Sequence, residues 1–388
     1  MRNLSKTLIS SLFLSLALPE RVVGQGPLWR VDHLQSSILR ERRKLFVATP
    51  EMSFQRAGRP VLIVLDADDE TQFSAAVANV AFLTNRLAIP PLLVIGVPNT
   101  RDRTHDLTPP ATGVTAENAP TAGGAEAFGR FLTDEVLPFL RRRYGAGQSA
   151  VLMGHSFGAL FALHFAARHP GTFAGTIAAS PSLWWNDTTV AREYAAALAA
   201  SRAPQRVFLS AGEFERQIGN ATTRFTAAFD SAAHDSLVVV QFARYPNETH
   251  GLTPQRSLID GLRFVFAPIS TANLPTARLG PGVDSVTVVE AVRNAQTQYA
   301  RAARVLALPE ALPVELLNRL APNVLSVLKR PGLAAWVYEQ NARMHPADPS
   351  VYDGWADALT ALGDTAQARL KREQASRLRR PSRAPRAP

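Results

Sequence analysis

The sequence predicts an α/β fold with a mostly parallel sheet, plus a small all-α C-terminal region. Two observations lead to this fold class. Between Arg59 and Phe266, apolar runs of strand length alternate with longer helical patterns, as they do in βαβ units. Beyond Phe266 this alternation ends, and only helical patterns follow.

The predicted strands are continuous apolar runs, as expected of strands that are buried on both faces. They read PVLIVLDA, PLLVIGVP, SAVLMG, TFAGTIAAS, RVFLSAG and SLVVVQFARYP. Helices are predicted between them, at residues 73–87, 124–144, 157–168, 190–201, 220–233 and 252–266.

Composition divides the chain into five segments. We expect a signal peptide at 1–24, an α/β domain at 25–268, a linker at 269–285, a tetratricopeptide-like helical region at 286–376 and a basic, Pro-rich, disordered tail at 377–388. One helix-turn-helix unit cannot bury its own apolar face. We therefore expect it to pack on the α/β domain, on a second degenerate unit or, by self-association, on another subunit.

The N-terminus has the three-part order of a secretory signal peptide. Arg2 and Lys6 precede an apolar run from Leu8 to Leu18, and small residues surround Gly24. This run is too short to span a bilayer. We expect it to be cleaved, which predicts a secreted or periplasmic protein without stable membrane insertion.

The net charge of +10 gathers at the other end of the chain. Between Arg369 and Pro388, eight Lys or Arg residues accompany the single acid Glu373. A basic, Pro-rich terminus is typical of a solvated tail. Since the remaining charge is nearly balanced, no nucleic-acid partner is predicted.

Several chemistries are disfavoured by residues that the sequence lacks. It contains no Cys, which excludes disulfides, a thiolate nucleophile and cysteine metal sites. The HExxH and H-x-x-x-H spacings are absent, and so is the phosphate-binding G-x-x-x-x-G-K-[ST] motif. We expect no metal and no cofactor.

The motif that carries chemistry is Gly154-His155-Ser156-Phe157-Gly158, between a predicted strand and a predicted helix. A G-x-S-x-G sequence in this setting is typical of the nucleophile elbow of the α/β-hydrolase fold, in which small neighbours let the serine stand exposed on a sharp turn. The alternative is a Gly-rich turn with a capping serine.

A serine hydroxyl needs a base within hydrogen-bond reach, and the base needs an orienting carboxylate. In this fold the chain order is Ser, acid, His. His250 follows a late strand directly, so it is the predicted base for Ser156. The acid should follow RVFLSAG, where Glu215 is our choice and Glu213 the alternative.

The oxyanion that forms on attack needs preorganised N–H donors. They come from the residue after the serine and from the loop after an early strand. These positions are Phe157 in the elbow, and Ala67 or Asp68 in the DADDE loop.

Several segments together resemble one family, over about residues 30–268. They are LDADDETQF, VIGVPNTRDRTHDLTP, GGAEAFGRFLTDEVLPFLRRRYG, GHSFGALFALHFAARHP, SPSLWW and ETHGLTPQRSLIDGLRFVF. The chain resembles the esterase D-type serine esterases, the group that contains the catecholate-siderophore trilactone esterases and relatives of S-formylglutathione hydrolase and the mycolyltransferases. The resemblance implies the nucleophile and base roles at Ser156 and His250.

The resemblance also implies a substrate site lined by the NTRDRTHDLTP loop and by Ser180, Trp184 and Trp185. In that loop Arg101 and Arg103 provide positive charge, and with the tryptophans they would bind an anionic aromatic ester through paired charges and ring stacking. The alternative is that the arginines form surface ion pairs and the tryptophans pack in the core.

Together these features predict a serine carboxylic-ester hydrolase that works through an acyl-enzyme on Ser156. Its partner would be a small-molecule ester, siderophore-like or another. Two alternatives remain open. One is an acyltransferase on the same residues, and the other is a non-catalytic binding or scaffold protein that uses the helical repeat.

Overall fold

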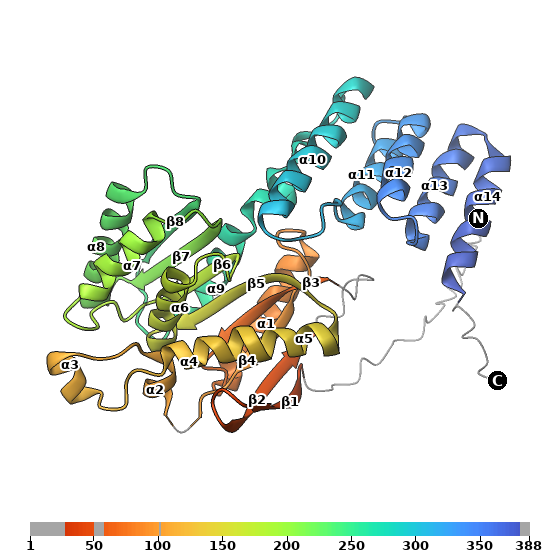
Figure 1. Ribbon diagram of the computed structural model, residues 1–388. Coiled ribbons are helices and arrows are strands. Elements are labelled where there is room, and N and C mark those ends of the chain that lie inside the picture. The colour runs from red at the N-terminus through yellow and green to blue at the C-terminus, as the bar shows by residue number, and fades with distance from the viewer. Residues whose placement is uncertain (1–27, 50–57, 101, 381–388) are drawn as a thin grey trace, which may run out of the picture.

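The computed structural model describes residues 28–49, 58–100 and 102–380. Within these residues the chain forms an 8-stranded sheet in the order β1-β2-β4-β3-β5-β6-β7-β8, with helices on both faces (Figure 1). Every neighbouring pair from β4 to β8 is parallel, whereas β1 pairs with β2 and β2 with β4 in antiparallel fashion. The predicted α/β fold with a mostly parallel sheet is confirmed.

The strands of the parallel part coincide with the predicted apolar runs. They are β3 (Arg59–Leu65), β4 (Leu93–Val97), β5 (Ala146–His155), β6 (Gly175–Ala179), β7 (Gln205–Gly212) and β8 (Val238–Tyr245). Two further strands, β1 (Arg30–Ser36) and β2 (Glu41–Ala48), were not predicted. They extend one edge of the sheet.

The helices of the α/β part follow the predicted alternation. They are α1 (Glu70–Asn85), α2 (Arg103–Leu107), α3 (Gly113–Asn118), α4 (Ala125–Arg130), α5 (Leu137–Tyr144), α6 (Phe157–Arg168), α7 (Thr189–Ala199), α8 (Arg216–Ala232) and α9 (Thr253–Val265). A π-helical turn, η1 (Phe131–Val136), joins α4 to α5. The helix predicted at 124–144 is therefore one helical segment with a wider turn in its middle.

Alternate side chains of the central strand β3 enter two different cores. Leu62 and Val64 pack with residues of α1 and α9 on one face of the sheet. Val61, Ile63 and Leu65 pack on the other face with residues of α4, η1 and α6. This burial on both faces explains why the strand reads as a continuous apolar run.

The C-terminal region consists of helices that contact one another in chain order, α11 with α12, α12 with α13 and α13 with α14 (Figure 1). Their bounds are α10 (Ser285–Val305), α11 (Val314–Ser326), α12 (Pro331–Met344), α13 (Pro349–Leu362) and α14 (Thr365–Arg379). Such nearest-neighbour stacking is typical of helical repeats. The hydrophobic core beneath α1 and α9 continues through α10 into these helices.

Two details differ from the predicted segment boundaries. The predicted linker, residues 269–285, contains the short 3-10 turns η3 (Thr271–Asn273) and η4 (Pro275–Arg278), and Leu274 between them is buried. At the other end, α14 continues past 376 to Arg379, which forms an ion pair with Asp353 of α13.

The predicted signal peptide at 1–24, and the tail from 381 onward, lie outside the described residues. None of the helices in the described part combines the length and the hydropathy needed to cross a bilayer.

Candidate functional site

The strand β5 turns into the helix α6 through a single residue. β5 ends at His155 and α6 begins at Phe157, so Ser156 alone forms the turn. Its φ of 58° and ψ of −114° lie in a region that residues other than glycine rarely adopt. This strained turn is the geometry of a nucleophile elbow, which exposes the serine hydroxyl at the carboxyl edge of the sheet.

The two glycines of the motif allow the backbones to approach closely. A Cβ atom on Gly154 would lie 2.1 Å from the carbonyl oxygen of Gly158, a distance that no relaxed structure tolerates. On Gly158 it would lie 2.9 Å from the Asp66 carboxylate. The turn around Ser156 therefore requires the glycine at 154, and it leaves little room at 158.

The loop after β7 brings a carboxylate to the loop after β8. His250 Nδ1 donates a hydrogen bond of 2.5 Å to Glu215 Oε1. The other carboxylate oxygen of Glu215 accepts hydrogen bonds from the Gly212 N–H at 2.5 Å and from the Ser180 hydroxyl at 2.7 Å. The carboxylate is thus fully engaged, and it is nearly buried.

The pKa of Glu215 reflects this environment. Burial raises it, but the hydrogen bonds from His250, Gly212 and Ser180 outweigh burial and hold the pKa below its usual value. Glu215 is therefore ionised at neutral pH, and it favours a proton on His250 Nδ1.

Glu213, the alternative acid, lies differently. Its carboxylate accepts a hydrogen bond of 2.9 Å from the Asn247 N–H, in the loop before His250. The structure brings Glu215, and not Glu213, into contact with the imidazole. Glu213 joins two neighbouring loops instead.

Ser156 and His250 both line one open cavity of about 460 Å³. The Ser156 hydroxyl lies 3.5 Å from that of Ser182, and the His250 side chain is 42% exposed. The lining also includes apolar and polar side chains, namely Phe157, Trp184, Phe214, Ile218, Glu215, Arg216 and Gln217. The serine, the histidine and an apolar surface therefore face the same space.

The imidazole of His155, in the elbow, packs against that of His250. The rings of His155 and His250 are 4.3 Å apart between centroids. Burial, followed by the nearby His250, lowers the pKa of His155 to about 4. His155 is therefore neutral at neutral pH and packs against His250 without adding a positive charge.

Arg103, predicted to bind substrate, is engaged inside the protein. Its guanidinium forms two hydrogen bonds with Asp66, of 2.5 and 2.9 Å, and lies 5.5 Å from the centre of the Phe157 ring. Burial lowers its pKa, but the contacts with Asp66 outweigh burial and raise it. Arg103 fastens the loop after β4 to the elbow, and its contact with substrate stays a prediction. Arg101 lies outside the described residues.

The two predicted tryptophans differ in position. Trp184 lines the cavity. Trp185 is 1% exposed, and its ring packs edge-on against Phe157 at 5.5 Å. Trp185 is therefore a core residue, which corrects its predicted contact with substrate.

The predicted oxyanion-hole donors differ in whether their N–H group already has a hydrogen-bond acceptor. Phe157 begins α6, where backbone N–H groups have no partner within the helix. The Ala67 N–H donates to the Val97 carbonyl at 3.4 Å, so it is already used. The Asp68 N–H has no hydrogen-bond acceptor among the described residues. Of the two alternatives in the DADDE loop, Asp68 fits the predicted role and Ala67 does not.

Sequence reasoning missed several cavity residues. Ser182, Phe214 and Ile218 all line it. Phe214 could have been predicted from the sequence. It is an apolar residue between two glutamates in a loop, where burial in the core is not expected. Ser180 was expected to line the substrate site, but it is buried behind Glu215 and contacts the carboxylate instead.

A family model described as "Putative esterase" matches residues 36–249, more than half of the chain. The chain belongs to this family. The resemblance to serine esterases is confirmed, whereas the tetratricopeptide-like character of the C-terminal helices is only partly supported.

Two curated relatives of this esterase are similar in sequence. Ferri-bacillibactin esterase BesA from Bacillus subtilis is 27% identical over 189 residues, which cover 44% of this chain and 65% of the relative. The siderophore enterobactin esterase from Emericella nidulans is 37% identical over 118 residues, 26% of this chain and 39% of the relative. The chain thus spans less than two thirds of the length of each.

Solved structures support the fold of the esterase. An IroE-like serine hydrolase from Shewanella oneidensis has a TM-score of 0.67 and 21% identity, covering 81% of this chain and 99% of its own. The siderophore hydrolase EstA from Aspergillus nidulans has a TM-score of 0.51 and 21% identity, covering 67% and 98%. The predicted α/β-hydrolase fold is confirmed.

The elbow generates a prediction about stability. Gly154→Ala should lower the free energy of unfolding by about 3 kcal/mol or more, because its methyl group meets a backbone carbonyl that cannot move away. Gly158→Ala should cost clearly less, because it meets the end of the Asp66 side chain. Thermal and urea unfolding of the two variants measure the difference. Equal losses would contradict this account of the turn.

Proposed function

We propose that this protein hydrolyses small carboxylic esters through an acyl-enzyme on Ser156, with His250 as general base and Glu215 as the orienting acid. The observation that carries the proposal is the 2.5 Å hydrogen bond from His250 to Glu215, in a cavity that Ser156 shares. The residues follow the chain order Ser, acid, His of α/β-hydrolases.

The roles follow from the geometry. Ser156 Oγ attacks the ester carbonyl, and its proton passes to His250 Nε2, the ring nitrogen that Glu215 leaves free. Contacts of this kind are often long before substrate binds and tighten in the complex. Glu215 stabilises the imidazolium that forms, while the N–H groups of Phe157 and Asp68 receive the oxyanion.

The tetrahedral intermediate then breaks down to the acyl-enzyme, which is hydrolysed in a second step. The bond between the acyl carbon and the alcohol oxygen breaks, and the imidazolium proton passes to the departing alkoxide. Water gives a proton to His250 and attacks the acyl-enzyme. The bond between the acyl carbon and Ser156 Oγ then breaks, and Oγ takes the proton back from the imidazolium, which releases the carboxylic acid and restores Ser156. Because the cavity is open and the His250 side chain is 42% exposed, water has access to this position.

The cavity also bears on the substrate. Trp184, Phe214 and Ile218 offer an apolar surface for an aromatic or acyl group. Arg216 lines the same cavity and pairs with no carboxylate among the described residues, so it attracts an anionic substrate. One relative is named as a siderophore enterobactin esterase and the other as a ferri-bacillibactin esterase, and siderophore-like esters are the substrate class that we propose.

We further propose that the mature protein is secreted or periplasmic and that its C-terminal helices permit self-association. The signal-peptide pattern at 1–24 supports the first point. The exposed leucines Leu362, Leu370 and Leu378 of α13 and α14 support the second. N-terminal sequencing of exported protein and sedimentation velocity test them.

Replacement of the reacting groups tests the chemistry. A fluorophosphonate probe should add covalently to the wild-type chain, as measured by intact mass, and should leave Ser156→Ala unmodified. His250→Ala should lower kcat by on the order of 10³ or more, because triad members act as a unit. Unchanged labelling of Ser156→Ala, or a loss below about tenfold in His250→Ala, would assign these roles elsewhere.

The neighbouring glutamates provide a matched pair for the acid. Glu215→Gln should lower kcat by on the order of 10³, because an amide cannot stabilise the imidazolium or keep the proton on Nδ1. Glu213→Gln should change kcat less than about threefold, because that side chain contacts a backbone N–H instead. Similar losses in both variants would contradict the assignment.

A substrate panel tests the proposed class. Purified mature protein should cleave ferric and iron-free catecholate trilactones as well as short p-nitrophenyl esters. Arg216→Gln should raise KM for the anionic trilactones by about tenfold, with little effect on the neutral esters, because it removes one charge contact. Cleavage of the short esters alone would reject the siderophore class and leave a general carboxylesterase. If neither class is cleaved although the probe labels Ser156, acyl transfer becomes the better explanation.

A further inference from the structure

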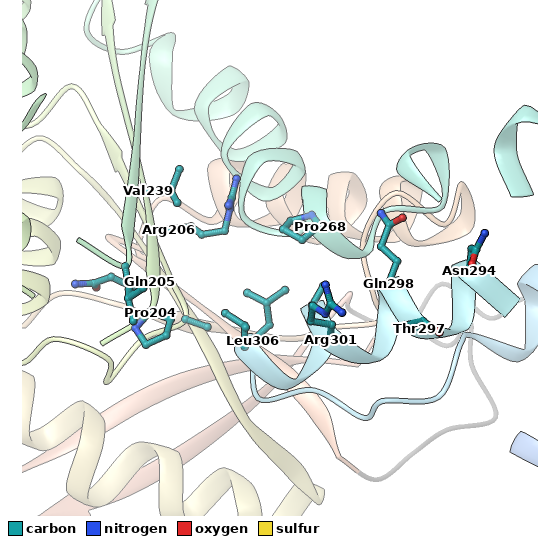
Figure 2. Close-up of a pocket in the computed structure, with 14 residues that line it drawn as sticks. Pro204, Gln205, Arg206, Val239, Pro268, Asn294, Thr297, Gln298, Arg301 and Leu306 are labelled. Carbon is teal, nitrogen blue, oxygen red and sulfur yellow. The ribbon is translucent and has the colours of Figure 1, made fainter. Parts of the chain in front are cut away.

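A second cavity, of about 600 Å³, lies where the sheet meets the first C-terminal helix. Its walls are the beginnings of β7 and β8, Pro268 in the turn after α9, and one side of α10 (Figure 2). Figure 2 shows the side chains of Gln298 and Arg301 extending from α10 toward Pro268. The size is that of sites that bind small molecules.

This cavity is separate from the candidate active site. It includes Gln205 at the start of β7. Glu215 and His250 lie beyond Gly212, at the opposite end of the same strand. At about 3.3 Å per residue the two ends of β7 are about 23 Å apart. A ligand bound here does not touch the reacting groups.

Two arginines and no acidic residues line the cavity. The Arg206 guanidinium is half-buried, donates a 3.0 Å hydrogen bond to the Phe264 carbonyl and lies 4.3 Å from the centre of the Phe264 ring. Arg301 is exposed on α10. Neither pairs with a carboxylate among the described residues. The cavity therefore holds two positive charges that the protein does not neutralise.

The partial burial of Arg206 makes its unpaired positive charge less favourable. Desolvation lowers the pKa of Arg206, with no neighbouring acid to oppose it. A partly buried cation of this kind gains more from a nearby anion than an exposed one does, because water screens the pair less.

Besides the polar side chains of Gln205, Asn294, Thr297 and Gln298, the lining contains apolar side chains that are open to water. Leu237, Val239 and Val305 remain 52%, 45% and 57% exposed. Pro204, Pro268 and Leu306 continue the surface between them. Contiguous exposed apolar surface of this kind typically marks a binding site.

We propose that this cavity binds a small amphipathic anion, an acyl chain or aromatic ring that carries a carboxylate. The carboxylate pairs with Arg301, Arg206 adds positive charge to the same cavity, and the apolar body covers Leu237, Val239 and Val305. Such a ligand contacts the sheet and α10 at once, so it stabilises their junction. The proposal is independent of the esterase chemistry.

Octanoate is a suitable probe, with octanamide as the uncharged analogue and acetate as the anion without a chain. Isothermal titration of the full chain should show octanoate binding at least about tenfold tighter than either analogue, because only octanoate offers both charge and chain. Octanoate should also raise the Tm of the chain, since it binds the folded state. Absence of octanoate binding, or equal binding of octanamide, would overturn the proposal.

Matched variants locate the site. Arg301→Gln should weaken octanoate binding about tenfold, and Val305→Asp, an exposed position, should weaken it through charge repulsion. Arg293→Gln removes a similar exposed arginine from the same helix outside the cavity and should change nothing. Arg216→Gln, in the other cavity, should also leave octanoate binding unchanged.

Three outcomes of the variant series would reject the site. A loss in Arg216→Gln that equals the loss in Arg301→Gln would place octanoate in the candidate active site. Equal losses in Arg293→Gln and Arg301→Gln would indicate non-specific charge attraction. If octanoate does not bind and the wild-type chain forms dimers that Val305→Asp abolishes, the surface is a protein interface. Because none of these measurements uses esterase activity, failure here leaves the proposed function untouched.

Discussion

The candidate site depends on how closely the end of β5 approaches the start of α6. That approach forces Ser156 into a conformation that costs about 1–3 kcal/mol, and the surroundings must hold it there. The Ser156 N–H donates to the Ala179 carbonyl of β6, and the Ser156 carbonyl accepts from the N–H groups of Leu160 and Ser182. The serine is thus fixed by a strand, a helix and a loop at once, which leaves its hydroxyl exposed.

The short helix α2 links this turn to β2, the second strand from one edge of the sheet. At the start of α2, Arg103 pairs with Asp66 and reaches the His155 carbonyl at 3.3 Å. Near its end, Asp106 forms a 2.5 Å ion pair with Arg43 of β2, whose buried guanidinium packs against Phe128 and Phe131. The five residues of α2 therefore tie the loop beside the elbow to the core through two charge pairs.

The sequence predicted the elements whose residue types are restricted by burial. The parallel strands and the elbow have strong local signatures, because apolar runs and a glycine pair leave few other structures. β1 and β2 carry charged and apolar residues together, as in RVDHLQS, since one face of an antiparallel strand can meet water. Their pattern resembles a loop. Likewise, Glu213 and Glu215 differ only in which way their loop turns, and this depends on contacts with a segment more than thirty residues away.

The continuous core beneath α1, α9 and α10 makes the C-terminal helices part of the folding unit. Val288, Val292 and Tyr299 of α10 share that core with Leu258 and Phe266. An ancestor without the repeat would have needed polar side chains on this face of the sheet domain. Gain or loss of the helices in evolution therefore requires coordinated substitution of the covered face, and shuffling of the repeat as an independent module is disfavoured.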